Sequence, residues 1–153
     1  MIAKVLREFQ GVEHRIELCN EIDGIRFVND SKGTNPDAAI RAIEAMKRDI
    51  ILIAGGYDKG ASFNEFVNAF DGKVKALVLL GKTATKIKEA AEKAGFTNTV
   101  ILKDMEACVR EAYRLAESGD VVLLSPACAS WDMYTSFEQR GEHFKACVRE
   151  LER

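Results

Sequence analysis

The sequence predicts an α/β protein with a Rossmann-like, mostly parallel sheet of about six strands, an N-terminal edge hairpin and helices on both faces. Short apolar runs rich in β-branched residues alternate with stretches of helical periodicity, and one pair of alternating segments precedes them. With 153 residues and 47% apolar content, the chain is long enough for a core of its own. No repeat or Pro/Gly-rich linker divides it, so we expect one domain over residues 13–153 after a short lead-in helix or linker remnant over residues 1–12.

The predicted strands differ in their pattern. Arg15–Cys19 and Ile25–Asn29 alternate between apolar and polar residues, and the segment Glu21–Gly24 between them has turn chemistry, which predicts an edge hairpin. The other strands are short, continuously apolar runs, as expected for strands covered on both faces. They are Ile50–Ala54, Ala76–Leu80, Thr99–Leu102 and Val121–Leu124.

The predicted helices have recognisable starts and ends. Asn35, with a proline after it, is a candidate N-cap; Ser62 with Glu65 forms a candidate capping box, and Thr83 and Asp104 are further candidate caps. In the last helix one buried stripe is predicted by the helical spacing of Phe137, Gly141, Phe144, Val148 and Leu151. The ends of the two preceding helices are predicted at Gly95 and Gly119.

Composition excludes several classes of function. A net charge of −2 without a cluster of Lys and Arg predicts no nucleic-acid partner and no membrane partner. The four cysteines contain no C-x-x-C pair and only two histidines could join them, so we expect no metal site. Free thiols and the lack of signal-peptide features favour the cytoplasm, and nothing in the surface composition suggests more than a monomer.

Two sequence features resemble catalytic motifs, but the residues around them do not complete either motif. Gly81-Lys82-Thr83 has the ending of a P-loop, but the glycine required five residues earlier is Ala76, so we expect a strand-to-helix turn. No G-x-G-x-x-G follows any strand. Cys128 lies in a strand-to-helix loop, but without a nucleophile elbow or a histidine base in sequence relation to it we expect a small buried loop residue.

Polar residues gather in three loops, each between an apolar run and a helical pattern: residues 29–36, 55–60 and 125–131. In an open α/β sheet, ligands bind where such loops meet at the carboxyl ends of the strands. Asp30, Lys32, Lys59 and Ser130, with the N–H groups of the helix after Ser136, would suit a small dianion.

Each of these residues also has an ordinary structural explanation. Asp30 and Asn35 could cap turns, Lys59 could be a solvated lysine in a glycine turn, and Ser130 could bond to local backbone. Their joint placement after successive strands favours the binding site.

The same loops resemble a known family. The motifs are Asp30-Ser31-Lys32-Gly33-Thr34-Asn35, Gly55-Gly56-x-Asp58-Lys59-Gly60, and Ser125-Pro126-Ala127-Cys128-Ala129-Ser130-x-Asp132 with Phe137-Glu138-x-Arg140-Gly141-x-x-Phe144. They are similar to the C-terminal domain of the UDP-N-acetylmuramoyl-L-alanine:D-glutamate ligases, within the Mur ligase family. The match spans essentially the whole chain.

The resemblance implies part of an ATP-dependent, amide-forming enzyme of peptidoglycan precursor synthesis. In that family the carboxylate of UDP-N-acetylmuramoyl-L-alanine is phosphorylated by ATP and attacked by the amine of D-glutamate, and this domain brings D-glutamate. ATP and Mg²⁺ are bound mainly by a central domain, and neither that domain nor the uridine-nucleotide domain is present here. Because the chain has no Walker loop, we expect it to be inactive alone. The alternative is a freestanding Rossmann-like adaptor that binds a nucleotide or a protein partner.

The resemblance also assigns roles to residues. The D-glutamate carboxylates would be held by Lys32, Thr34, Lys59 and Ser130 and by main-chain groups of Trp131 and Phe137. The nucleotide contacts would come from Arg15, reaching phosphate, and from Asp30, on the ribose side; Ser31 and Asn35 would support the loop. No metal ligand is implied.

Overall fold

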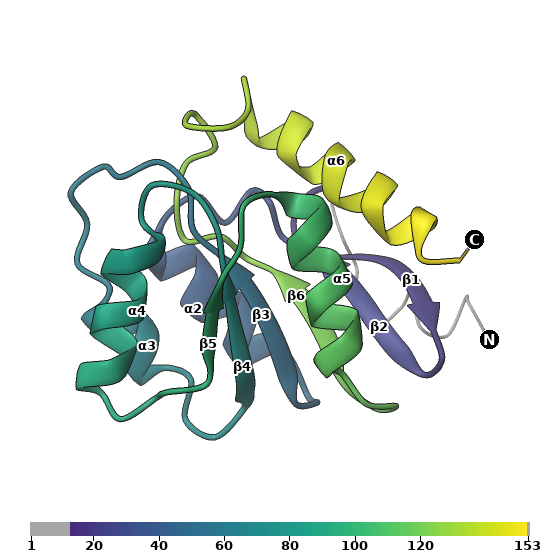
Figure 1. Ribbon diagram of the computed structural model, residues 1–153, viewed down its shortest axis with the longest axis horizontal. Coiled ribbons are helices and arrows are strands. Elements are labelled where there is room, and N and C mark those ends of the chain that lie inside the picture. The colour runs from purple at the N-terminus through teal and green to yellow at the C-terminus, as the bar shows by residue number, and fades with distance from the viewer. Residues whose placement is uncertain (1–12, 153) are drawn as a thin grey trace.

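The computed structural model describes residues 13–152, so the lead-in helix expected over residues 1–12 lies outside the described residues. A central sheet has helices on both faces (Figure 1). Its strands are β1 (Glu17–Ile22), β2 (Ile25–Asn29), β3 (Ile50–Ala54), β4 (Val74–Leu79), β5 (Thr99–Ile101) and β6 (Val121–Leu124). Its helices are α2 (Pro36–Ala45), α3 (Asn64–Asn68), α4 (Ala84–Lys93), α5 (Met105–Leu115) and α6 (Phe137–Glu150).

The six strands lie in the order β1-β2-β6-β3-β4-β5. Only β1 and β2 pair in antiparallel fashion; the other pairs are parallel, which confirms the predicted fold class. The last strand, β6, inserts between β2 and β3. Three strands distant in sequence therefore end side by side at one edge, and the loops that follow them are neighbours.

The side chains of the buried parallel strands alternate between two apolar clusters. In β3, Ile50, Leu52 and Ala54 face the cluster formed with α2, α3 and α4. Ile51 and Ile53 face the cluster formed with α5 and α6. These helices lie on opposite faces of the sheet (Figure 1). Phe144 of α6 is fully buried, so this helix is fixed on the sheet by its core contacts.

The hairpin turn is shorter than the sequence pattern suggests. Glu21 and Ile22, expected in the turn, belong to β1 and pair with Arg26 and Ile25. The turn consists of Asp23 and Gly24, with φ values of 54° and 79°. Two consecutive residues of positive φ form the two-residue turn whose twist matches that of a hairpin, and this lengthens the strand.

The predicted helix starts are confirmed at two positions. The side chains of Asn35 and Asp104 each accept a hydrogen bond from a backbone N–H three residues later, at 2.9 Å. The capping box at Ser62 is wrong: α3 begins at Asn64, and the Ser62 hydroxyl accepts only the N–H of Asn64 at 3.3 Å, two residues on.

The two predicted helix-ending glycines differ. Gly95 follows the last residues of α4 with a φ of 86°, as expected. Helix α5 instead ends at Leu115, and Gly119 lies in the turn before β6.

Candidate functional site

The three predicted loops lie together at the carboxyl ends of β2, β6 and β3. The middle loop, residues 125–136, is bonded to both neighbours. On one side the N–H of Ala127 donates to the carbonyl of Gly33 at 2.9 Å. On the other, the N–H of Tyr57 donates to the carbonyl of Ala129 at 2.8 Å. Backbone contacts thus join the loops that carry Lys32, Ser130 and Lys59 into one edge.

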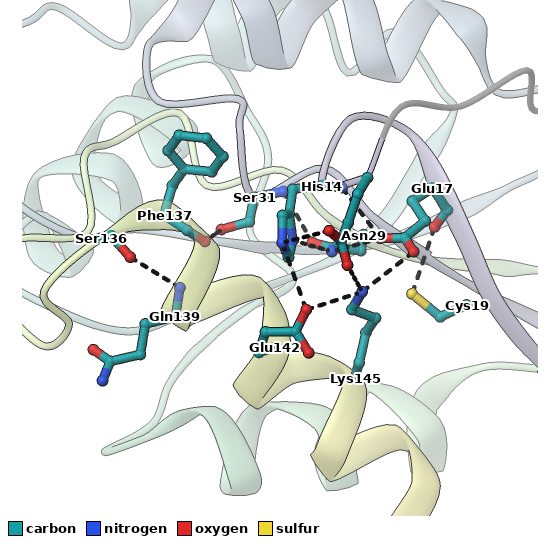
Figure 2. A network of polar contacts seen from close by, with 11 residues as sticks. His14, Glu17, Cys19, Asn29, Ser31, Ser136, Phe137, Gln139, Glu142 and Lys145 are labelled. Atoms are coloured by element: carbon teal, nitrogen blue, oxygen red, sulfur yellow. Dashed lines mark hydrogen bonds and ion pairs between the residues drawn. The ribbon is translucent and has the colours of Figure 1, made fainter.

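Arg140 of α6 fastens two of these loops from beneath. Its Nε and Nη2 donate to the hydroxyl and carbonyl oxygens of Ser31, at 2.9 and 2.7 Å. Its Nη1 donates to the carbonyl of Cys128 at 2.9 Å. Ser31 in turn donates its hydroxyl hydrogen to the carbonyl of Phe137 at 2.7 Å (Figure 2). Burial lowers the pKa of Arg140 to about 10. Because this value is still well above 7, the guanidinium is charged at neutral pH.

Sequence reasoning gave Arg140 no role, although a signal was present. The residue lies three positions after Phe137 and four before Phe144, which is the spacing of the buried helix face. A charged residue at such a position needs partners, because a buried guanidinium without them is costly. Arg140 is only 3% exposed.

Asp30 ties the first loop to the sheet. Its carboxylate accepts hydrogen bonds from the Ser125 hydroxyl at 2.7 Å and from the N–H of Ile16 at 3.1 Å. Burial raises the pKa of Asp30 to about 6, although these two hydrogen bonds lower it in part. The side chain is 4% exposed, so the structural explanation considered for Asp30 describes its contacts well.

Lys32 and Lys59 are exposed, and neither ammonium group forms an ion pair with a residue between 13 and 152. Thr34, two residues after Lys32, is half-buried. Ser130 is 2% exposed. Its carbonyl accepts two local N–H groups, whereas its hydroxyl bonds to none of the described residues. These side chains are therefore available to a ligand.

The N-terminus of α6 closes the same edge. Ser136 caps it by accepting the N–H of Gln139 at 3.1 Å, and the Gln139 side chain accepts the N–H of Thr135 at 2.7 Å. The first N–H groups of a helix have no intrahelical partner, and they favour an anion. Phe137 begins the helix. Trp131 is 63% exposed and contacts Tyr57 in a tilted arrangement, with ring centroids 5.5 Å apart and an interplanar angle of 60°.

Arg15 lies beside the Asp30 loop. The carbonyl of His14 accepts the N–H of Lys32 at 2.9 Å, and the N–H of Ile16 donates to Asp30. The backbone on both sides of Arg15 is thereby tied to this loop, and its side chain is exposed.

The turn at Gly81-Lys82-Thr83 is no phosphate cradle. The N–H of Lys82 donates to the carboxylate of Asp132 at 3.0 Å. Thr83 occupies the N-cap position but makes no capping bond; its hydroxyl accepts the N–H of Gly56 at 3.0 Å. The sequence-based capping role is therefore wrong, because the hydroxyl is used between loops instead.

Cys128 contacts the Thr83 hydroxyl, with 3.2 Å between sulfur and oxygen. Burial raises the pKa of its thiol to about 11. A thiol of this pKa is protonated at neutral pH, which fits a buried loop residue and not a nucleophile.

Fold and site together define an α/β domain with cationic side chains at the carboxyl ends of its strands. None of the helices between residues 13 and 152 has the length and apolar content needed to span a membrane. Residues 14–128 match the family described as "Mur ligase, glutamate ligase domain". The chain belongs to this Mur ligase family.

Relatives with longer sequences support the assignment. The chain is 58% identical over 155 residues to the UDP-N-acetylmuramoylalanine--D-glutamate ligase of Thermoanaerobacter sp. (strain X514), covering all of this chain and 34% of that protein. It is 54% identical over 151 residues to the enzyme of the same name from Clostridioides difficile (strain 630), covering 99% of this chain and 34% of that protein. The chain thus spans about a third of the length of these relatives.

Solved structures agree on the fold. The UDP-N-acetylmuramate-alanine ligase of Thermotoga maritima superposes with a TM-score of 0.66 at 15% identity, covering 97% of this chain and 33% of that one. FolC of E. coli, solved with ADP, gives a TM-score of 0.63 at 16% identity, covering 93% and 33%.

Proposed function

We propose that this chain is the D-glutamate-binding domain of an ATP-dependent ligase that joins D-glutamate to UDP-N-acetylmuramoyl-L-alanine. The observation that carries the proposal is that Lys32 and Lys59 lie on the two loops bonded to the loop that carries Ser130. Among residues 13–152, neither lysine has an ion-pair partner and the Ser130 hydroxyl has no hydrogen-bond partner. Two ammonium groups match the two carboxylates of glutamate. The relatives are named as ligases that act on UDP-N-acetylmuramoylalanine and D-glutamate, which favours a ligase domain over a freestanding adaptor module.

In this proposal the lysines and the hydrogen-bonding groups have different roles. Lys32 and Lys59 attract the carboxylates as mobile point charges. Thr34, Ser130 and the main chain at Trp131 and Phe137 supply directional hydrogen bonds, which a chiral amino acid needs for multipoint recognition.

The nucleotide would be held mainly by residues outside this chain. ATP would supply the phosphoryl group that activates the substrate carboxylate, with Mg²⁺ bound by the remainder of the ligase. The N–H groups of Lys82 and Thr83 already donate to Asp132 and Gly56, so this turn does not fit a triphosphate. Arg15, exposed beside the site, would reach a phosphate, and Asp30 would contribute to the ribose side. The chain alone would therefore show neither ligase nor ATPase activity, and we propose a cytoplasmic monomer.

A titration of the ¹⁵N-labelled chain with D-glutamate tests the proposal, with L-glutamate as the stereochemical control. We expect D-selective amide shifts at Lys32, Lys59, Ser130 and Phe137 at millimolar ligand. The double variant Lys32→Ala, Lys59→Ala should lose the response, whereas a control variant with alanine at the exposed Lys47 and Lys103 should keep it. Equal shifts with both isomers, or no shift in the wild-type chain, would contradict the proposal.

A further inference from the structure

A polar network of His14, Glu17, Asn29, Glu142 and Lys145 lies next to the candidate site and has no part in the proposed ligand contacts (Figure 2). It joins the segment before β1 and the first residue of that strand to the end of β2 and to α6. Lys145 of α6 supplies its positive charge, with its Nζ 3.2 Å from Glu17 and 3.3 Å from Glu142. Burial alone would lower the pKa of Lys145, but the hydrogen bonds that its ammonium donates to carboxylates raise it overall.

Asn29 is held in one orientation. Its amide oxygen accepts the N–H of Ser31 at 3.0 Å. Its amide nitrogen lies 3.1 Å from an oxygen of Glu17 and 2.9 Å from Nδ1 of His14. Flipping the amide would set two donors face to face at Ser31 and two acceptors face to face at Glu17, so the network excludes it.

This orientation determines the tautomer of His14. Because the Asn29 nitrogen only donates, Nδ1 of His14 must accept, and the ring hydrogen must lie on Nε2. Nε2 of His14 lies 3.6 Å from a carboxylate oxygen of Glu142 and 3.9 Å from one of Glu13. Glu13, His14 and Glu142 could otherwise hold a metal ion, since their ligand atoms lie within 4.8 Å of one another. A protonated Nε2 and the nearby Lys145 ammonium both argue against that use.

The network reaches the proposed pocket through two hydrogen bonds. The carbonyl of His14 fixes the N–H of Lys32 at 2.9 Å. Ser31 connects Asn29 to α6: its N–H donates to the Asn29 side chain, and its hydroxyl donates to the carbonyl of Phe137. The backbone of Lys32 is therefore tied to His14, and the first residue of α6 is tied to Asn29 through Ser31.

Gly141 shows how closely α6 approaches this contact. A Cβ at this position would lie 2.2 Å from Nδ1 of His14 and 3.0 Å from the amide nitrogen of Asn29. Only glycine leaves room for the hydrogen bond, although alanine is the better helix former.

We propose that Asn29 and the Nε2-protonated form of His14 are positioning residues for the acceptor amino-acid pocket. They hold the backbone of Lys32 and the start of α6 in the arrangement that the two carboxylates require. This inference rests on the proposed function for its ligand, but the tautomer and the backbone positions can be measured in the free chain.

The first measurement is the imidazole ¹⁵N spectrum of the whole chain, with His143→Gln used to assign the His14 signals. We expect the neutral tautomer protonated at Nε2 near neutral pH. In Asn29→Asp the carboxylate still accepts from Ser31 but cannot donate to His14, so the His14 hydrogen should move to Nδ1 or the ring should become doubly protonated. An Nδ1-protonated ring in the wild-type chain would overturn the inference.

The second measurement compares D-glutamate binding. Asn29→Asp should raise the dissociation constant about tenfold, the effect of losing one buried hydrogen bond. Gly141→Ala keeps both polar residues but would displace the His14 ring, so it should act in the same direction. Asn68→Asp, at an exposed position of α3, should have no effect. Unchanged binding in folded Asn29→Asp and Gly141→Ala would refute the positioning role.

The two proposals fail separately. Lack of any response of the wild-type chain to D-glutamate would remove the proposed ligand. The amide signals of Lys32 and Phe137 in free Asn29→Asp would still report on positioning, and unchanged signals would refute it.

Discussion

Replacing Asp30 by asparagine should make the protein more stable at neutral pH. The carboxylate of Asp30 is 4% exposed, and its two hydrogen-bond donors, Ser125 and the N–H of Ile16, are neutral. Burial raises its pKa to about 6. An asparagine of the same shape could accept from Ile16 and donate to Ser125 without carrying a charge.

The sign and size follow from linkage between protonation and folding. The unfolded chain releases the Asp30 proton near pH 4, whereas the folded protein holds it until about pH 6. The stabilisation by this proton is therefore fully present below pH 4 and is lost as the pH rises through 6. A shift of about two pKa units corresponds to about 3 kcal/mol of unfolding free energy, an upper value for one site.

Urea unfolding of wild type and Asp30→Asn at several pH values between 4 and 7.5 provides the assay. The two proteins should have similar stability near pH 4, and the variant should gain about 2–3 kcal/mol over the wild type by pH 7. Asp71→Asn, at an exposed turn, should show no such trend. A difference between Asp30→Asn and wild type that stays constant with pH, or grows in favour of the wild type, would refute the argument.

Three further perturbations test the framework of the site by urea or thermal unfolding. Arg140→Lys replaces a three-bond guanidinium by a single ammonium and should cost about 2 kcal/mol; a loss below about 0.5 kcal/mol would show that the Ser31 contacts are weak. Phe144→Ala should cost about 3–5 kcal/mol through the cavity under α6, and a well-tolerated change would mean that the helix is not fixed there. Asn35→Ala should cost about 1 kcal/mol as a lost cap, whereas Ser62→Ala should change stability by less than about 0.5 kcal/mol; equal effects would contradict the assigned caps.

The sequence predicts elements best where composition changes abruptly. Ile50–Ala54 and Val121–Leu124 are observed with the predicted bounds, because a charged residue precedes each run and a glycine or serine follows it. The hairpin turn was placed too early, since the choice of a two-residue turn depends on the pairing of both strands and not on local polarity. Ser62 failed as a cap because α3 is set by the packing of Phe63 and Phe66.

The candidate site could be predicted as a set of loops but not as a set of contacts. The α/β pattern predicts a mostly parallel sheet, in which the loops that carry Lys32, Lys59 and Ser130 all follow strand ends at one edge. The strand order that makes these loops neighbours is seen only in the structure. The contacts of Arg140 and His14 depend on which polar groups the tertiary structure buries together. No spacing in the sequence encodes that His14 accepts from Asn29 across fifteen residues.

The site separates the residues that would meet a ligand from those that shape it. Lys32 and Lys59 are exposed and unpaired with any residue between 13 and 152, so truncating them should leave folding within about 0.5 kcal/mol of wild type. Asp30 and Arg140 are buried and bonded, and changing them should alter stability strongly. The raised pKa of Asp30 indicates that the fold gives up stability to keep a carboxylate at this loop. Such a cost is expected of a functional site, where local conformation is selected for binding and not for stability.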